Sequence, residues 1–387
     1  MTPPIRGFAK SEFGVRTQRA QAKMAKKGLT ALLLTTEPEV RYYTGFLTRF
    51  WESPTRPWFV VVPPIGNPIA VIPSIGAHLM GQTWITDIRT WQAPDYDDDG
   101  IKLLAQTLRE VTPLRGKIGL ADEMESHVQM PLASLRAIET MLDGRALIGD
   151  GGITRDLRLV KSDAEVDKIR TAAQIADRAF DRVPEIARAG APLSKVFRDF
   201  QAQCLNEGAD WVPYLAGAAD RGGYNDVISP ATDAPLRQGD ILMLDTGLVW
   251  DGYFCDFDRN FSIGTPNAAT QSAQAQLIDA THAAFELAKP GAVISDLFHA
   301  MNGVINPSGK TMEAGRLGHG LGMQLTEWPS IIARDHTVLV EGMVLTLEPS
   351  VNLSGEKIMV HEENIVIREH GAEFLSTPQK GQVRIAG

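Results

Sequence analysis

The sequence contains only two cysteines, Cys204 and Cys255, which is too few for a disulfide scaffold. It lacks any apolar run approaching the roughly 20 residues that cross a bilayer, and Met1–Phe8 lacks the basic and apolar stretches of a secretion signal. Positive charge is not in excess either, because the formal net charge is −9 and no basic stripe is present. These absences favour a cytoplasmic protein with no membrane and no nucleic acid among its partners.

The composition is that of a globular protein, with 44% hydrophobic and 22% charged residues, and a chain of 387 residues suffices for two domains. In the N-terminal part, short apolar runs such as Ala31–Thr35 alternate with helix-like stretches, which predicts a small α/β domain. In the C-terminal part, helical stretches are segregated from strand pairs, which predicts an α+β domain. A turn cluster over 149–152 and a capping box at Ser162 mark the boundary. We therefore predict domains over 1–155 and 156–387.

Three carboxylates are expected on one face of a hairpin in the C-terminal domain. Asp251-Gly252 predicts a two-residue turn, and the register that follows from it puts Asp245 opposite Asp258. Asp256 is two residues from Asp258 and therefore projects from the same face. Buried like charges are costly unless a cation neutralises them. The alternative is an edge hairpin with a solvated acidic face.

A second acidic hairpin repeats this pattern. Glu348 and Glu362 are equidistant in sequence from Gly355, so an antiparallel pair centred there sets them opposite each other. Between the two hairpins, His319 stands in a Gly-His-Gly segment whose glycines allow close backbone approach and leave the imidazole accessible. One imidazole and four carboxylates suit Mn, Fe, Co or Zn ions, and two ions that share bridging carboxylates would account for the number of acids. The predicted metal ligands are Asp245, Asp256, His319, Glu348 and Glu362.

The order and spacing of these five residues resemble the ligand signature of the "pita-bread" metallohydrolases, which include methionine aminopeptidase, aminopeptidase P, prolidase and creatinase. The segments Asp-Thr-Gly-Leu, Gly-His-Gly-Leu-Gly, Leu-Glu-Pro and His-Glu-Glu-Asn stand in the family's order. Tyr42-Tyr-Thr-Gly-Phe resembles a motif of the prolidase–creatinase branch. The resemblance implies a C-terminal pita-bread catalytic domain, a smaller N-terminal creatinase-like α/β domain, two divalent metal ions and a homodimer. It also implies catalytic roles for Glu348, as proton shuttle and ligand, and for His319.

Several positions depart from the family's pattern. Ile228 and Thr326 stand where peptidases of the family usually carry two histidines that bind substrate and move protons. Asp258 stands where threonine is usual, and Val360 where arginine is common. Neither Ile228 nor Thr326 can carry a proton near pH 7, so we expect an intact metal site that hydrolyses peptides slowly.

A loop in the N-terminal domain is rich in arginine and tryptophan. By resemblance to prolidase–creatinase dimers, such a loop reaches the site of the partner subunit, where arginine would hold a carboxylate and tryptophan a cationic or apolar group. The alternative is an exposed loop whose aromatic residues pack on their own domain. The predicted substrate-binding residues are Arg49, Trp51, Arg56, Trp58, Thr326 and His361.

These features together predict a dinuclear metal-dependent hydrolase of a small amide or an Xaa-Pro-like dipeptide. An alternative is a non-peptidase of the same fold, either a creatinase-like C–N hydrolase or a lyase for a small osmolyte, and the missing histidines favour it. A third possibility is a non-catalytic binding protein. The complete ligand set argues against that possibility, because unneutralised buried acids are costly.

Overall fold

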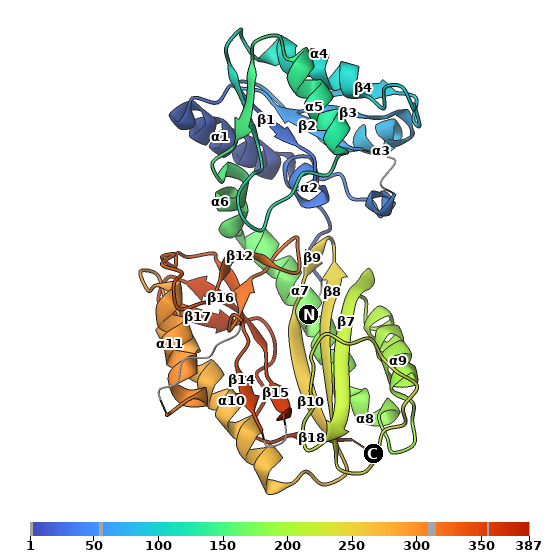
Figure 1. Ribbon diagram of the computed structural model, residues 1–387, viewed down its shortest axis with the longest axis vertical. Helices are drawn as coiled ribbons and strands as arrows, with labels where there is room; N and C mark the ends of the chain where they lie inside the picture. Colours follow the sequence, from blue (N-terminus) through green and yellow to red (C-terminus); the bar gives the residue numbers. More distant parts are fainter. Residues whose placement is uncertain (1–2, 54–56, 309–314, 354–355, 387) are drawn as a thin grey trace. The chain divides into compact units, whose positions relative to one another are not determined.

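The computed structural model describes residues 3–53, 57–308, 315–353 and 356–386 (Figure 1). The chain divides into two units, Ile5–Arg158 and Leu159–Gly387, the second of which also includes Met1–Pro4, whereas the sequence analysis set the boundary at 155–156. The helices in the described part of the chain are all too short or too polar to cross a membrane.

The N-terminal unit is built on a mixed six-stranded sheet in the order β4-β3-β2-β1-β5-β6. The central strand β1 pairs antiparallel with β2 and parallel with β5. Strands β1, β2 and β3 are buried along their whole length, which explains why their sequences are continuously apolar. The strands are β1 (Ala31–Leu34), β2 (Phe59–Val62), β3 (Ile69–Pro73), β4 (Asp87–Trp91), β5 (Lys117–Leu120) and β6 (Ala146–Gly149).

Helices complete this unit and confirm its α/β character. Helix α4 presents Leu104 and Leu108 to the same buried cluster that contains Leu33 and Phe59 of the sheet. The helices are α1 (Lys10–Lys27), α2 (Glu37–Thr44), η1 (Phe50–Glu52), η2 (Ser74–Gly76), α3 (Ala77–Met80), α4 (Ile101–Val111), α5 (Leu132–Met141) and α6 (Ile153–Leu159).

The C-terminal unit begins with the capping box that the sequence predicts, in which the Ser162 side chain accepts a hydrogen bond from the Glu165 backbone N–H. Its strands lie between α10 and α11 on one side and α8 and α9 on the other, as Figure 1 shows, which is the expected α+β arrangement. The helices are α7 (Asp163–Asp181), α8 (Val183–Ile186), α9 (Leu193–Asn206), α10 (Ala268–Leu287) and α11 (Ile294–Ile305).

The strands of this unit form two larger sheets and a short ribbon. One sheet has the order β18-β10-β8-β7 with β9 paired to β8, the other has the order β12-β11-β13-β16-β17, and β14 pairs with β15. The strands are β7 (Trp211–Arg221), β8 (Asp240–Trp250), β9 (Tyr253–Phe254), β10 (Phe257–Ile263), β11 (His319–Gly320), β12 (Glu327–Ser330), β13 (Val344–Leu347), β14 (Ser350–Asn352), β15 (Ile358–Val360), β16 (Glu363–Arg368), β17 (Gly371–Phe374) and β18 (Arg384–Ala386).

The first acidic hairpin has the predicted register. Asp245 of β8 lies opposite Asp258 of β10. Asp251 and Gly252 form the turn with φ values of 48° and 80°, the left-handed conformation that a tight two-residue hairpin turn requires. The turn chemistry therefore fixes which side chains of this hairpin share a face.

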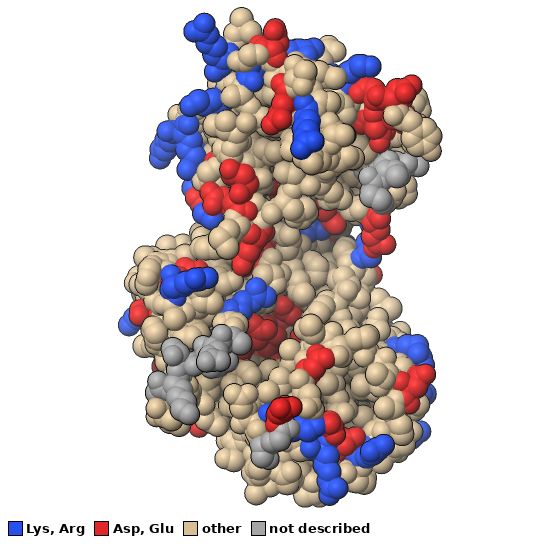
Figure 2. Space-filling model, viewed as in Figure 1, with Lys and Arg blue, Asp and Glu red and all other residues tan. Residues whose placement is uncertain are grey.

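The second hairpin also follows the predicted register, since Leu347 pairs with Glu363 and, farther along, Ser350 pairs with Val360. This register sets Glu348 and Glu362 opposite each other where the β13–β16 ladder passes into the β14–β15 ribbon. Gly355, the predicted centre of the turn, lies outside the described residues. In the space-filling view, acidic side chains gather in a hollow on one face of the C-terminal unit (Figure 2).

Candidate metal centre

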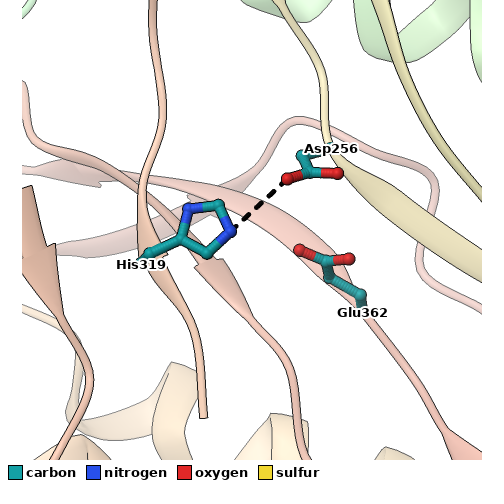
Figure 3. Close-up of side chains that lie close together, drawn as sticks. All are labelled: Asp256, His319 and Glu362. Carbon is teal, nitrogen blue, oxygen red and sulfur yellow. Dashed lines mark ion pairs between the residues drawn. The ribbon is translucent and has the colours of Figure 1, made fainter. Parts of the chain in front are cut away.

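Three of the five predicted ligands form a compact buried cluster. Figure 3 shows the side chains of Asp256, His319 and Glu362 pointing toward one another. The Nε2 atom of His319 lies 3.4 Å from Oδ2 of Asp256, and one potential ligand atom from each of the three residues lies within 4.8 Å of those of the others. Each residue stands next to or at the start of a different strand: Asp256 before β10, His319 in β11 and Glu362 before β16.

Asp245 and Glu348 share the electrostatic environment of this cluster but are only partly buried. Burial, and then the charges of Asp256 and Glu348, raise the pKa of Asp245 well above its ordinary value. Burial and the charges of the same neighbours likewise raise the pKa of Glu362. The carboxylates of Asp245, Asp256, Glu348 and Glu362 therefore act on one another, and Asp245 and Glu348 are the two that are partly exposed.

The residues fit a divalent metal ion on two observations. Oδ1 of Asp245 and Oε1 of Glu362 are buried and have no hydrogen-bond donor among the described residues. A carboxylate oxygen is costly to bury unless a donor or a cation satisfies it. The donor set of one imidazole and four carboxylates is hard and rich in oxygen, as first-row divalent ions prefer. The cluster therefore brings suitable ligand atoms together and leaves buried carboxylate oxygens that a cation would stabilise.

Two glycines allow the close backbone approach around His319 that the sequence predicted, but the imidazole is buried rather than accessible. Gly318 has φ 136°, and a Cβ atom there would lie 2.2 Å from the backbone oxygen of Thr346. A Cβ on Gly320 would lie 2.2 Å from the backbone oxygen of Trp328. The Nδ1 atom of His319 lies 2.8 Å from the backbone oxygen of Gly320, so Nδ1–H donates there and Nε2 is left to face the carboxylates.

Asn364 joins the two hairpins and was missed by the sequence analysis. Its Oδ1 accepts a hydrogen bond of 3.0 Å from the Asp256 backbone N–H, and its Nδ2 donates to the Asp256 backbone oxygen. This side chain is fully buried in β16. The amide therefore pairs with the Asp256 backbone as a neighbouring strand would. It holds Asp256 beside β16, the strand that directly follows Glu362. An asparagine inside an apolar strand was the one available sequence signal.

Arg259 links the same two hairpins from the opposite face of β10, since it directly follows Asp258 in the strand. Its Nη1 donates to the backbone oxygen of Glu362 at 2.9 Å, and its Nη2 donates to Oε2 of Glu363 at 2.9 Å. Burial alone would raise the pKa of Glu363, but Arg259, His361 and Ser376 together lower it to about 2. Arg259 thus neutralises Glu363 rather than the clustered ligands.

Comparison with known proteins identifies the family. The model of "Metallopeptidase family M24" matches residues 167–369, and that of the "Creatinase/Prolidase N-terminal domain" matches residues 16–160. The first of these matches covers more than half of the chain. This protein belongs to metallopeptidase family M24. It is accordingly a metal-dependent hydrolase of the pita-bread fold, with a creatinase-type N-terminal domain.

Individual relatives extend the match along the chain. The protein is 28% identical over 370 residues to a Mycobacterium tuberculosis protein named "Probable dipeptidase PepE", covering 95% of each chain. It is 30% identical over 234 residues to the Xaa-Pro dipeptidase of Pyrococcus furiosus, covering 59% of this chain and 66% of that one. The crystal structure of dipeptidase PepE from Mycobacterium ulcerans superposes with a TM-score of 0.84 at 26% identity, covering 98% of this chain and 99% of that chain.

The two substitutions at the usual histidine positions of M24 peptidases lie in different surroundings. Ile228 is 79% exposed on a loop. Thr326 is partly buried and accepts a hydrogen bond of 3.2 Å from Nη2 of Arg316. Tyr214 of β7, which the sequence analysis did not single out, donates from its hydroxyl to Oδ2 of Asp245 at 3.1 Å. In this M24 chain, an arginine–threonine pair and a tyrosine therefore stand beside the acidic cluster.

His361 is directed away from the acidic cluster. It is buried, and its Nε2 lies 3.2 Å from Oε1 of Glu363. Burial lowers its pKa, which favours the neutral imidazole. This placement supports a role in fixing the strand behind Glu362, and gives no support to the predicted substrate contact.

The predicted substrate loop of the N-terminal unit is more closely packed than the sequence indicated. Trp51 and Trp58 are buried, with ring centroids 6.1 Å apart, and Trp58 also packs against Phe46. For these two tryptophans the structure favours the alternative in which the aromatic residues pack on their own domain. Arg49 is exposed and pairs with Glu52. Arg56 lies outside the described residues.

Proposed function

We propose that this protein is a dinuclear M24 dipeptidase that hydrolyses small dipeptides, including Xaa-Pro dipeptides. The observation that carries the proposal is the convergence of buried Asp256, His319 and Glu362 with the partly exposed Asp245 and Glu348. The relatives are named dipeptidase and Xaa-Pro dipeptidase. Their names favour a peptidase over the creatinase-like hydrolase or the osmolyte lyase that the sequence left open.

We assign metal binding to all five ligands and proton transfer to one of them, Glu348. Two divalent ions held by the five ligands would polarise the scissile carbonyl and would lower the pKa of a water from its bulk value to about 7. Glu348 is the carboxylate we assign to proton transfer, because it is partly exposed while Asp256 and Glu362 are buried. It takes a proton from the attacking water and delivers it to the amine nitrogen that leaves. The hydrogen bond from His319 Nδ1 to Gly320 keeps Nε2 turned toward the acids.

The test is turnover of the metal-loaded protein on a panel of Xaa-Pro dipeptides, other dipeptides, betaines and cyclic amides. We expect hydrolysis of dipeptides at rates below an ordinary value of about 10 s⁻¹, because Ile228 and Thr326 cannot replace the usual histidines as proton carriers. Glu348→Gln should abolish that turnover. Turnover of a betaine or a cyclic amide with none on any dipeptide would instead establish the non-peptidase alternative.

We also propose that the protein is a cytoplasmic homodimer that uses Mn, Fe, Co or Zn. The support for the compartment is that Cys204 and Cys255 are both free and buried, as is usual where thiols stay reduced. The support for the dimer and for the metals is the resemblance to the prolidase–creatinase branch. Light scattering of the purified protein tests the dimer, and activity after reconstitution with each metal in turn tests the metals.

A further inference from the structure

Arg316 lies three residues before His319 of β11, and its hydrogen-bond partner Thr326 directly precedes β12, which pairs with β11. Burial raises the pKa of Asp256 and Glu348, and the positive charge of Arg316 acts on both in the opposite direction. The guanidinium is therefore within electrostatic reach of a buried ligand and of a partly exposed one.

The position of the guanidinium is set by Thr326. Nη2 of Arg316 donates to Oγ1 of Thr326 at 3.2 Å, and both side chains are partly buried. Thr326 is also the residue that replaces a usual peptidase histidine. The hydroxyl thus positions a cation beside the cluster, at a point where relatives of this fold usually place an imidazole.

Arg316 does not act as a direct counter-ion of the acids. Within the described residues Arg316 forms no ion pair, and its one hydrogen-bond partner is Thr326. Two divalent ions would balance the four ligand carboxylates, so the charge of Arg316 is not needed for neutrality once the site is loaded. A guanidinium has five N–H donors in a planar fork that matches a carboxylate. Arg316 therefore has a positive charge and free N–H donors, held in position by Thr326, that a substrate carboxylate can bind.

We propose that Arg316, positioned by Thr326, binds the free C-terminal carboxylate of the dipeptide and selects it over neutral analogues. The inference rests on the proposed dipeptidase function and names the group that the site reads at the far end of the substrate. It assigns the carboxylate contact to a residue of the catalytic domain, whereas the sequence analysis had assigned it to Arg49 and Arg56 of the N-terminal loop.

The first arm of the test compares KM values for an Xaa-Pro dipeptide and its C-terminal amide on metal-loaded protein. Arg316→Met should raise the KM for the acid by roughly 10- to 100-fold, as loss of a charge-assisted hydrogen bond predicts, and should leave the KM for the amide within about twofold. Arg316→Lys should recover part of the preference, because it restores the charge without the fork. Arg334→Met, which removes an exposed arginine of the same unit, is the matched control and should change neither value.

The second arm needs no turnover. Calorimetry of the metal-loaded protein with N-acetyl-L-proline and with its amide should show at least about tenfold tighter binding of the acid, and Arg316→Met should abolish the difference. Equal weakening of acid and amide, or an unchanged preference for the acid, would overturn the proposal. So would loss of metal or of thermal stability in Arg316→Met relative to Arg334→Met. Should the wild type hydrolyse no dipeptide, the proposed function fails, and this binding comparison still decides the role of Arg316.

Discussion

Asp245 and Asp258 face each other across the antiparallel pair of β8 and β10. Asp258 is buried, and its Oδ1 has no hydrogen-bond partner among the described residues. Burial and then the charge of Asp245 raise the pKa of Asp258 well above its ordinary value. One carboxylate beyond the five predicted ligands therefore adds unfavourable energy directly beside the candidate metal centre.

We predict that Asp258→Asn stabilises the metal-free protein and leaves its capacity to bind metal intact. An amide of the same shape avoids both the repulsion from Asp245 and the cost of protonating a buried carboxylate. The expected rise in the unfolding midpoint is about 2–4 °C for each 1 kcal/mol recovered, measured by scanning calorimetry in the presence of a chelator. Asp279→Asn, at an exposed position of α10, should leave the midpoint unchanged. A lower midpoint, or loss of bound metal, would show that Asp258 is itself a ligand.

Removal of single ligands should separate metal binding from folding. We predict that Asp256→Asn and His319→Ala each weaken metal binding by more than about 100-fold and lose activity in parallel, while the circular dichroism of the fold survives. His299→Ala, at an exposed position of α11, serves as the matched histidine control and should retain both. Full metal content in either ligand variant would mean that the ligands have been assigned wrongly.

The sequence predicted the registers of the two acidic hairpins correctly because both hairpins are determined locally. Asp251-Gly252 requires a two-residue turn, and strand alternation then decides that Asp245, Asp256 and Asp258 share a face. The second hairpin follows the same reasoning about its own centre. These features depend on neighbouring residues only, so they can be read without knowledge of the rest of the fold.

Contacts between distant segments could not be predicted in this way. Asn364 clasps Asp256 across 108 positions of the chain, and Tyr214 reaches Asp245 from a strand that the sequence did not pair with it. The packing of the N-terminal loop could not be predicted either, because burial of Trp51 and Trp58 depends on their contact with each other and with Phe46. Turn residues and strand alternation determine the register of each hairpin, whereas tertiary packing determines which distant side chains contact its acidic residues.

A single methyl group should reveal how closely the histidine segment is packed. We predict that Gly318→Ala destabilises the protein by about 2–4 kcal/mol, since the new Cβ meets the Thr346 backbone at 2.2 Å in a left-handed conformation. Displacement of His319 should weaken metal binding as well. Gly303→Ala, in an exposed and uncrowded position of α11, should be neutral or stabilise by up to about 1 kcal/mol. Equal midpoints for the two variants in thermal unfolding would contradict the close approach.

Asp177 gives a prediction for the pH dependence of stability. Burial raises its pKa from 3.8 to about 6, although Arg259 and Thr377 oppose the shift. Since the folded state then binds the proton more tightly than the unfolded state, this group's contribution to stability is complete below pH 3.8 and is lost as pH rises through 6. Relative to Asp177→Asn, the wild-type free energy of unfolding should fall by about 2–3 kcal/mol between pH 4 and pH 7. Parallel pH profiles for the two metal-free proteins would show that Asp177 is not perturbed.

The most direct test of the account is the metal content of the reconstituted protein. After loading with Mn, Fe, Co or Zn and removal of excess ion, elemental analysis should find about two ions per chain, as five ligands with shared carboxylates allow. The same preparation of Asp256→Asn should contain markedly less. A content near zero in the wild type with all four metals offered would contradict the assignment of the acidic cluster as a dinuclear centre.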